Sequence, residues 1–327
     1  MRFLVTGATG FIGSHMAELI LARGWEAVCP VRNPSALRNL KGIPASIIAI
    51  EDLDAEISNK GPFDYVIHLA GATRAADYRG YRRTNVERTQ ELLEKFANSE
   101  CRASLKRFVL VSSQAATGPS TDDGACRTES DPLCPVSLYG RSKAEAEEVA
   151  LRYKDRLPIT IIRPPTVFGP RDTDVLGVFK CAAYRLAPCI AGPDRLVSII
   201  YVEDLAEGIL AAAFSPASEG EIYFLANPKP VVWREFALEV ARVMGKRAMA
   251  VPVPLFAMKL LAFAGDIAGK ARGVPPLFRT EKLEEMRQIA WVCSPEKAFT
   301  DLGWKPRFPL AEAIKKTAEW YKANGWL

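Results

Sequence analysis

The 327-residue sequence contains only two histidines, and its seven cysteines include no Cys-x-x-Cys pair. A metal centre built from several histidines is therefore excluded, and the cysteine spacing indicates neither a zinc site nor a disulfide framework. A catalytic Ser-His-Asp triad would have to use His68. We predict no metal site, and the unpaired cysteines favour a reduced, cytoplasmic setting.

Long hydrophobic runs and long basic blocks are also missing. The longest apolar stretch, residues 251–265, contains two prolines and a lysine and is too short to span a bilayer. The net charge of +5 is spread along the chain, which argues against a nucleic-acid partner. Because the N-terminus enters a predicted strand directly, we expect no signal peptide and no transmembrane segment.

The chain does contain a glycine-rich turn near its beginning. Apolar residues 3–5 predict a buried strand, a helical pattern starts at residue 14, and Gly7, Gly10 and Gly13 lie between them. A strand, a tight turn and a helix in succession are typical of a unit that holds a dinucleotide pyrophosphate at a helix N-terminus. We expect Gly7 to turn the chain, Gly10 to let the backbone approach the phosphates and Gly13 to allow close helix packing.

Arg32 follows a second predicted strand at residues 25–31, nineteen positions after Gly13. An NAD-specific site usually has Asp or Glu here to bind the ribose 2′-hydroxyl, whereas an arginine suits the 2′-phosphate of NADP. We therefore predict NADP(H) as the preferred cofactor, with NAD as a possible one. The alternative is that Arg32 simply faces solvent.

Alternating strands and helices continue to about residue 163 and predict an α/β protein with a doubly wound parallel sheet. Further strands are expected at residues 46–50, 64–69, 107–111 and 159–162, and an amphipathic helix at residues 84–98. Ligands bind at the carboxyl edge of such a sheet. At that edge Asp52 and Leu53 could reach an adenine ring. Ala70 and Gly71 leave room for a flat cofactor, and Ser113 follows the fifth strand.

Tyr139 and Lys143 are four positions apart in an alanine- and glutamate-rich segment, so they share one face of a predicted helix. A phenol with an ordinary pKa of about 10 is a poor base at neutral pH. A lysine one turn away and a positive nicotinamide ring would lower this pKa. Tyr139 is therefore a candidate acid–base group.

Seven short motifs, in this order, resemble the short-chain dehydrogenase/reductase (SDR) superfamily in its extended branch of NAD-dependent epimerases and dehydratases. They are Thr6-Gly-Ala-Thr-Gly-Phe-Ile-Gly13, Val66-Ile-His-Leu-Ala-Gly71, Asn85, Val111-Ser-Ser113, Tyr139-x-x-x-Lys143, Arg163-Pro164 and Tyr201-Val-Glu-Asp-Leu205. The resemblance covers essentially the whole chain. It implies that Ser113, with Ser112 as the fallback, holds the substrate oxygen, and that Lys143 also holds the nicotinamide ribose.

The resemblance and the residue pattern together give a set of expected contacts. Those to the cofactor are Gly7, Thr9, Gly10, Phe11, Ile12, Gly13, Arg32, Asp52, Leu53, Leu69, Ala70, Gly71, Tyr139, Lys143 and Pro164. Those to the substrate are Thr73, Gln114, Thr166, Val167 and Arg171. Family members often dimerise through the helices that begin near residues 84 and 139, so a homodimer is expected.

A Rossmann domain is expected at residues 1–165 plus roughly 196–226, and a smaller, mostly helical substrate-binding domain at residues 166–195 and 227–327. In the later part of the chain, helices are predicted at residues 178–187, 204–214 and 310–324, and strands at residues 196–202 and 221–225. Apolar residues 252–263 and 273–278 either add hydrophobic surface to the substrate domain or only pack in its core. The sequence leaves open whether they touch a membrane.

Sub-branches of the family differ at positions that this sequence allows us to compare. Sugar-nucleotide 4,6-dehydratases carry Asp-Glu where this chain has Gln114-Ala115. Many sugar-nucleotide epimerases carry an Arg-Asp pair that is absent before Tyr201, although Arg195 could substitute for its arginine. We therefore predict an oxidoreductase that interconverts a secondary alcohol and a ketone on a medium-sized, partly apolar small molecule. The alternatives are a nucleotide-sugar epimerase with a recycled cofactor and a cofactor-sensing or scaffold protein without turnover.

Overall fold

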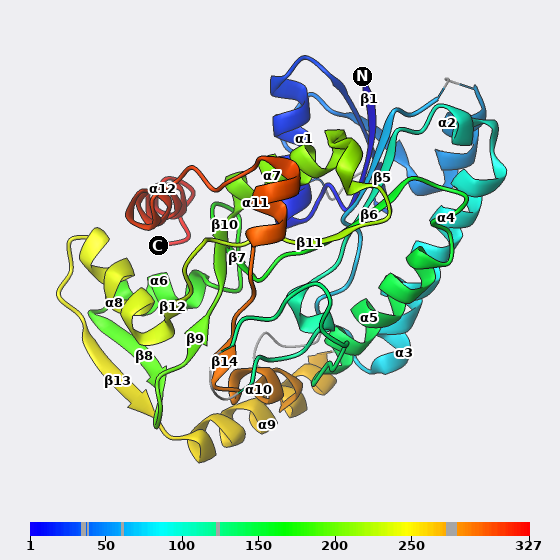
Figure 1. Cartoon of the computed structure of the whole chain (residues 1–327). Helices are drawn as coiled ribbons and strands as arrows, with labels where there is room; N and C mark the ends of the chain where they lie inside the picture. The colour runs from blue at the N-terminus through cyan, green and yellow to red at the C-terminus, as the bar shows by residue number, and fades with distance from the viewer. Residues whose placement is uncertain (34–36, 38, 60–61, 122–124, 273–279) are drawn as a thin grey trace.

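The computed structural model describes residues 1–33, 37, 39–59, 62–121, 125–272 and 280–327. Its centre is a seven-stranded parallel sheet in the order β11-β6-β5-β4-β1-β2-β3 (Figure 1). The strands are β1 (Arg2–Thr6), β2 (Glu26–Val31), β3 (Ser46–Ala49), β4 (Tyr65–His68), β5 (Arg107–Val111), β6 (Ile159–Arg163) and β11 (Ile222–Phe224). The strand order reverses between β1 and β4, where ligands bind in sheets of this kind. The predicted doubly wound Rossmann sheet is confirmed.

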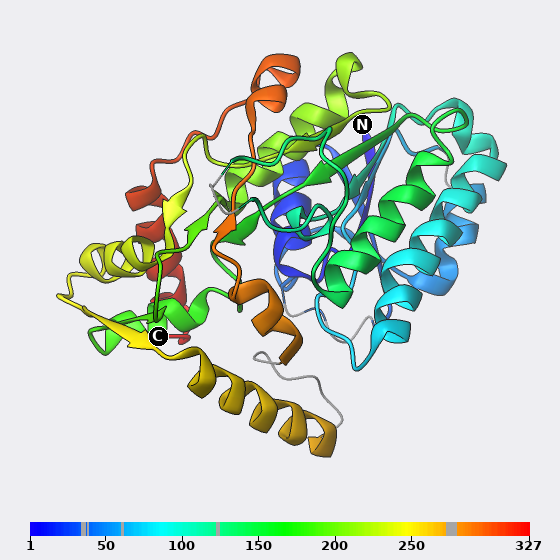
Figure 2. The same ribbon diagram turned by 60° about the horizontal axis from the view of Figure 1, so that its bottom comes forward.

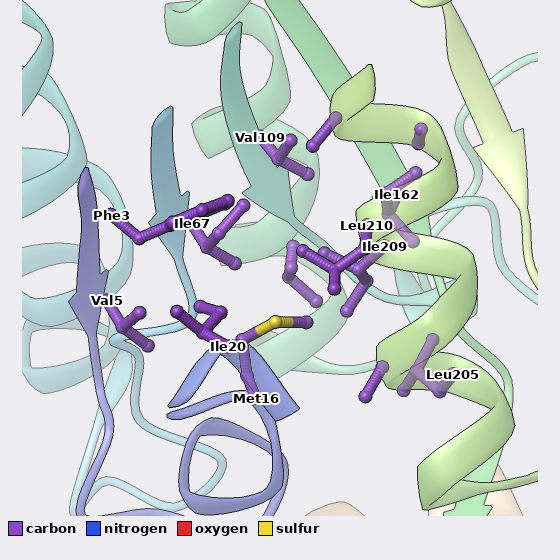
Figure 3. Packing of buried hydrophobic residues seen from close by; sticks show 14 of the residues in the cluster. Phe3, Val5, Met16, Ile20, Ile67, Val109, Ile162, Leu205, Ile209 and Leu210 are labelled. Carbon is purple, nitrogen blue, oxygen red and sulfur yellow. The ribbon is translucent and has the colours of Figure 1, made fainter. Parts of the chain in front are cut away.

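Helices cover both faces of the sheet. One face packs against α1 (Phe11–Ala22) and α7 (Val202–Phe214), as Figure 3 shows for Met16 and Leu205. The other face packs against α2 (Leu53–Asn59), α4 (Arg88–Asn98) and α5 (Leu138–Leu151). Neighbouring residues on one strand therefore enter different cores: Phe3 and Val5 lie in the first, and Leu4 lies in the second.

Short helical turns connect these elements. They are α3 (Tyr78–Tyr81), a π-helical turn (Arg82–Glu87), and the 3-10 turns at Ile50–Asp52, Glu100–Ala103, Gln114–Ala116 and Pro216–Ser218. The helix predicted at residues 84–98 thus begins earlier, and its first part winds as a π-helix. Such turns often accompany functional positions.

The later part of the chain forms a third core around Phe179, Phe236 and Tyr321. Its helices are α6 (Leu176–Ala183), α8 (Trp233–Val243), α9 (Leu255–Arg272), α10 (Thr280–Met286), α11 (Glu296–Leu302) and α12 (Leu310–Ala323). Its strands are β7 (Thr166–Phe168), β8 (Leu186–Ile190), β9 (Leu196–Val197), β10 (Ile199–Tyr201), β12 (Val231–Val232), β13 (Met249–Val253) and β14 (Ala290–Trp291). These strands form small separate sheets, and the region is otherwise helical as predicted.

Two predictions about this later part are wrong in detail. The helix predicted at residues 178–187 stops at Ala183, because Arg185 adopts a positive φ of 63° and the chain then enters β8. The strand predicted at residues 196–202 is divided between β9 and β10, which pair with other short strands. The apolar segment 273–278 lies outside the described residues. Within the described ranges, no helix is long and apolar enough to cross a membrane.

Candidate active site

The glycine turn between β1 and α1 is packed too tightly for side chains. Gly7 has a φ of +73°, and a Cβ there would lie 2.6 Å from the backbone nitrogen of Ala70. A Cβ on Gly13 would lie 2.2 Å from the Gly7 carbonyl oxygen. Gly10 is the N-cap of α1 and supplies no capping side chain, so the first N–H groups of the helix stay available to an anion. This tight backbone turn fits the pyrophosphate of a dinucleotide.

The predicted adenosine contacts lie at the carboxyl ends of β2 and β3. Arg32 follows β2 directly and is exposed, and Asp52 is exposed in the 3-10 turn after β3. Leu53 is buried at 5% exposure in the second core, which argues against the predicted side-chain contact with the cofactor. Asn39, which the sequence did not single out, donates from Nδ2 to the Thr9 carbonyl oxygen at 3.0 Å.

His68 has a structural environment. Its Nδ1 lies 2.6 Å from Thr6 Oγ1, and its Nε2 lies 2.9 Å from Thr89 Oγ1. Burial lowers the pKa of His68 to about 3, so the ring is neutral. His68 therefore links the ends of β1 and β4 to α4 and does not form a catalytic triad. Thr6 Oγ1 also accepts from the backbone N–H of Ala70 at 3.2 Å, which fixes the exit of β4.

Asn85, in the π-helical turn, holds two parts of the site together. Its Oδ1 accepts from the backbone N–H of Ala72 at 2.6 Å, and its Nδ2 donates to the Ala72 carbonyl at 3.0 Å. Nδ2 also donates to Ser142 Oγ on α5 at 2.8 Å. The chain leaving β4 is thereby fixed to the helix that carries Tyr139.

Ser113, Tyr139 and Lys143 come together at the carboxyl end of β5. The Ser113 hydroxyl lies close enough to the Tyr139 phenol to lower its pKa, and the neighbouring Ser112 is buried. Lys143 is 6% exposed and donates from Nζ to the Val111 carbonyl oxygen at 2.8 Å. Burial lowers the Lys143 pKa to about 8, and Glu147 opposes that shift.

The protein's own groups raise the pKa of Tyr139, whereas the expected lowering depended on Lys143 together with the positive nicotinamide ring. Burial is the main cause, and the Ser113 hydrogen bond only partly offsets it. The negative charges of Glu285 and Asp174 raise this pKa further. Tyr139 is therefore a protonated phenol at neutral pH.

Two carboxylates of α10 reach the N-terminus of α5, and sequence reasoning missed both. Glu281 accepts from the backbone N–H of Tyr139 at 3.1 Å and from the Tyr81 hydroxyl at 3.3 Å. Glu285 accepts from Ser137 Oγ at 2.6 Å. Acidic groups are favoured at a helix N-terminus, but no local signal connects residues 142 positions apart.

The predicted substrate contacts differ in their burial and in their hydrogen-bond partners. Gln114 is buried, and its Nε2 has no hydrogen-bond partner among the described residues, so it is available to a ligand. Thr73 is exposed, with its carbonyl accepting from the Tyr81 hydroxyl at 3.3 Å. Thr166 and Val167 are half-buried on β7. Arg171 instead donates to Ser14 at 3.1 Å and Glu18 at 2.6 Å on α1, which does not support a substrate contact.

The remaining predicted cofactor contacts lie around the glycine turn and the strand ends. Phe11 and Ile12 begin α1 and are half-buried, as are Leu69 and Ala70 after β4, whereas Gly71 is exposed. Pro164 is buried after β6, and its carbonyl accepts from the backbone N–H of Gln114 at 2.9 Å. These residues line the same edge of the sheet as Ser113.

Comparison with known proteins agrees with this geometry. The model of the NAD dependent epimerase/dehydratase family matches residues 3–226. A ceramide reductase from Caulobacter vibrioides is 28% identical, with 99% of this chain and 95% of the relative covered. A UDP-glucose 4-epimerase from Vibrio cholerae is 27% identical, with 97% and 94% covered. The structure of UDP-glucuronic acid 4-epimerase from Bacillus cereus with UDP-glucuronic acid and NAD has a TM-score of 0.77 at 21% identity, covering 99% and 100%, and shows the same fold.

The chain therefore belongs to the NAD-dependent epimerase/dehydratase family, as its motifs predicted. It is an NAD(P)-dependent enzyme of the extended SDR type. The predicted reaction class, hydride transfer between a secondary alcohol and a ketone, is confirmed at this level.

Proposed function

We propose that the protein is an NADP(H)-preferring reductase that converts a ketone on an apolar small molecule into a secondary alcohol. The placement of Tyr139 next to Ser113, with Lys143 one helical turn away on α5, carries this proposal. Ser113 holds the ketone oxygen, and Tyr139 donates the proton to it. Lys143 would hold the nicotinamide ribose, and the nicotinamide would supply the hydride when bound.

The raised pKa of Tyr139 favours the reductive direction. A phenol that stays protonated at neutral pH can donate its proton to the oxygen that gains negative charge during reduction. Alcohol oxidation requires the phenolate instead, which burial and the nearby carboxylates disfavour. We therefore expect oxidation to be favoured only at higher pH.

The surroundings of Arg195 support a reductase over a nucleotide-sugar epimerase. Arg195 donates to the carbonyls of Met286 at 3.2 Å, Pro193 at 3.0 Å and Ile190 at 3.4 Å. Its guanidinium is thus used within the protein and does not replace the missing arginine that grips a nucleotide diphosphate. The similarity to a relative named ceramide reductase also supports an apolar substrate for this protein.

The preference for NADP(H) rests on Arg32. Its exposed side chain follows β2, where a guanidinium can pair with a 2′-phosphate.

The homodimer through the helices beginning near residues 84 and 139 remains a proposal, and sedimentation of the purified protein tests it. A cytoplasmic location also remains a prediction.

The proposed function is tested by incubating the purified protein with NADPH or NADH and ketones of increasing alkyl length. We expect stoichiometric oxidation of NADPH by an apolar ketone, with no interconversion of UDP-glucose and UDP-galactose. Tyr139→Phe serves as the inactive control. Epimerisation of a nucleotide sugar without net cofactor consumption would overturn the proposal.

A further inference from the structure

Helix α9 exposes its large apolar side chains to solvent. Phe256, Leu260, Phe263 and Ile267 are 68%, 65%, 62% and 56% exposed. At about 100° per residue these four positions form one narrow stripe along the helix. Leu261 is also 62% exposed, but it lies about 100° around the helix from Leu260 and outside this stripe. A surface helix normally presents polar residues on this face, so the usual arrangement is reversed.

The opposite face of α9 is packed. Met258 and Ala262 are buried against Leu283 of α10. The five exposed residues are therefore not part of the core, which answers the question that the sequence left open for residues 252–263. We call Phe256, Leu260, Phe263 and Ile267 the α9 stripe.

A groove between α9 and α10 adjoins the stripe. It has a volume of about 610 Å³ and is lined by apolar residues that include Phe256, Leu260 and Leu283. Lys259 also lines this groove, and Arg287 is ion-paired there with Glu284 at 3.0 Å. Figure 2 shows α9 at the lower edge of the molecule, where its outer side can meet a flat surface.

We infer that the α9 stripe docks on a phospholipid bilayer, with the helix lying in the plane of the interface. Apolar side chains enter the acyl boundary, and Lys259, next to Leu260 in the groove, meets the lipid phosphates. The exposed area of the stripe is on the order of 500 Å². Each partner of a standard protein interface buries about 800 Å², so the area is small for a stable dimer.

The docking helix is close to the proposed catalytic tyrosine. α10 packs on α9, and its Glu281 accepts from the backbone N–H of Tyr139 at 3.1 Å. A bilayer in contact with α9 is therefore only one helix, α10, away from Tyr139, and we infer that an apolar substrate is delivered from the bilayer on this side. The docking itself rests on the exposed stripe, and only this delivery of substrate rests on the proposed function.

Flotation of the full-length protein with phosphatidylcholine vesicles tests the inference. We expect the wild-type protein to float with the vesicles, and the double variant Leu260→Glu/Phe263→Glu to bind at least about tenfold more weakly. Met249→Glu is the matched control, because Met249 is a 70% exposed apolar residue outside α9. It should bind as the wild type does. Thermal unfolding and turnover of a short, water-soluble ketone should be the same in all three proteins.

Three outcomes would overturn the inference. The wild-type protein could remain unbound, or the double variant could bind vesicles as strongly as the wild type. Alternatively, sedimentation could show a dimer that the double variant loses, together with no vesicle binding, and the stripe would then be a protein interface. If vesicle binding is confirmed but no ketone is reduced, the proposed function fails and the docking surface stands.

Discussion

Replacing Lys143 with methionine should stabilise the protein and abolish its turnover. Burial lowers the Lys143 pKa from 10.5 to about 8. Each pKa unit corresponds to about 1.4 kcal/mol, so carrying this cation costs the folded state about 3 kcal/mol below pH 8. Methionine fills a similar space without charge and loses one hydrogen bond, to Val111, that contributes about 1 kcal/mol. We expect the variant to gain about 1–3 kcal/mol in unfolding free energy.

The stability gain of the variant over the wild type should shrink as the pH rises above 8. Between pH 8 and 10.5 the unfolded chain still binds the proton that native Lys143 has released, so wild-type stability rises with pH in this window. The advantage of the variant is therefore constant below pH 8 and shrinks by up to about 1.4 kcal/mol per pH unit above it. Burial raises the pKa of Cys29 and Cys293, which lowers the stability of both proteins at high pH. The difference between the two proteins is the quantity to measure.

Urea unfolding at pH 7, 8 and 9.5, followed by tryptophan fluorescence, measures this difference. Lys154→Met is the matched control, since Lys154 is exposed on the surface and its replacement should change stability by less than about 0.5 kcal/mol. The reasoning about Lys143 would be refuted by a variant less stable than wild type at pH 7. An advantage that stays constant up to pH 9.5 would also contradict it.

Three further substitutions test the proposed site. Tyr139→Phe should keep NADPH affinity, measured by fluorescence titration, and lower kcat by at least about 100-fold; near-normal turnover would mean that another group donates the proton. Arg32→Asp should shift the NADPH to NADH ratio of kcat/KM by at least about tenfold, and an unchanged ratio would exclude Arg32 from cofactor selection. Gly13→Ala, whose Cβ would lie 2.2 Å from the Gly7 carbonyl, should weaken cofactor binding at least about tenfold. Gly177→Ala, with open space around its Cβ, should leave binding unchanged, and equal effects of both would contradict the role of the turn.

The parts of the fold that the sequence predicted well depend on local patterns. The strand at residues 107–111 has the predicted bounds, and the turn between β1 and α1 follows the predicted glycine spacing. Buried strands, amphipathic helices and glycines with positive φ are each determined by a few neighbouring residues. The order of these elements in a doubly wound sheet then brings Ser113 and Tyr139 to one edge without further information.

Features that depend on distant residues were not predictable in this way. From the sequence, both Arg171 and Arg195 could bind a ligand. In the structure Arg171 pairs with Glu18 of α1, and Arg195 donates to backbone carbonyls. The Tyr139 pKa is another case, because burial and the distant Glu285 and Asp174 raise it. A side chain's partners and its solvation are set by tertiary packing, which a single sequence does not specify.

The α9 segment shows why hydrophobicity alone could not identify a surface. Residues 252–263 are apolar on nearly all sides, so their pattern fits both core packing and exposure. Packing removes the ambiguity, because Met258 and Ala262 are buried against α10 while Leu260 and Phe263 stay exposed. Since Leu260 and Phe263 contribute little to that contact, replacing them should affect binding to a bilayer without lowering stability. A hydrophobic side chain that leaves folding unchanged when replaced is expected at a docking surface and not in a core.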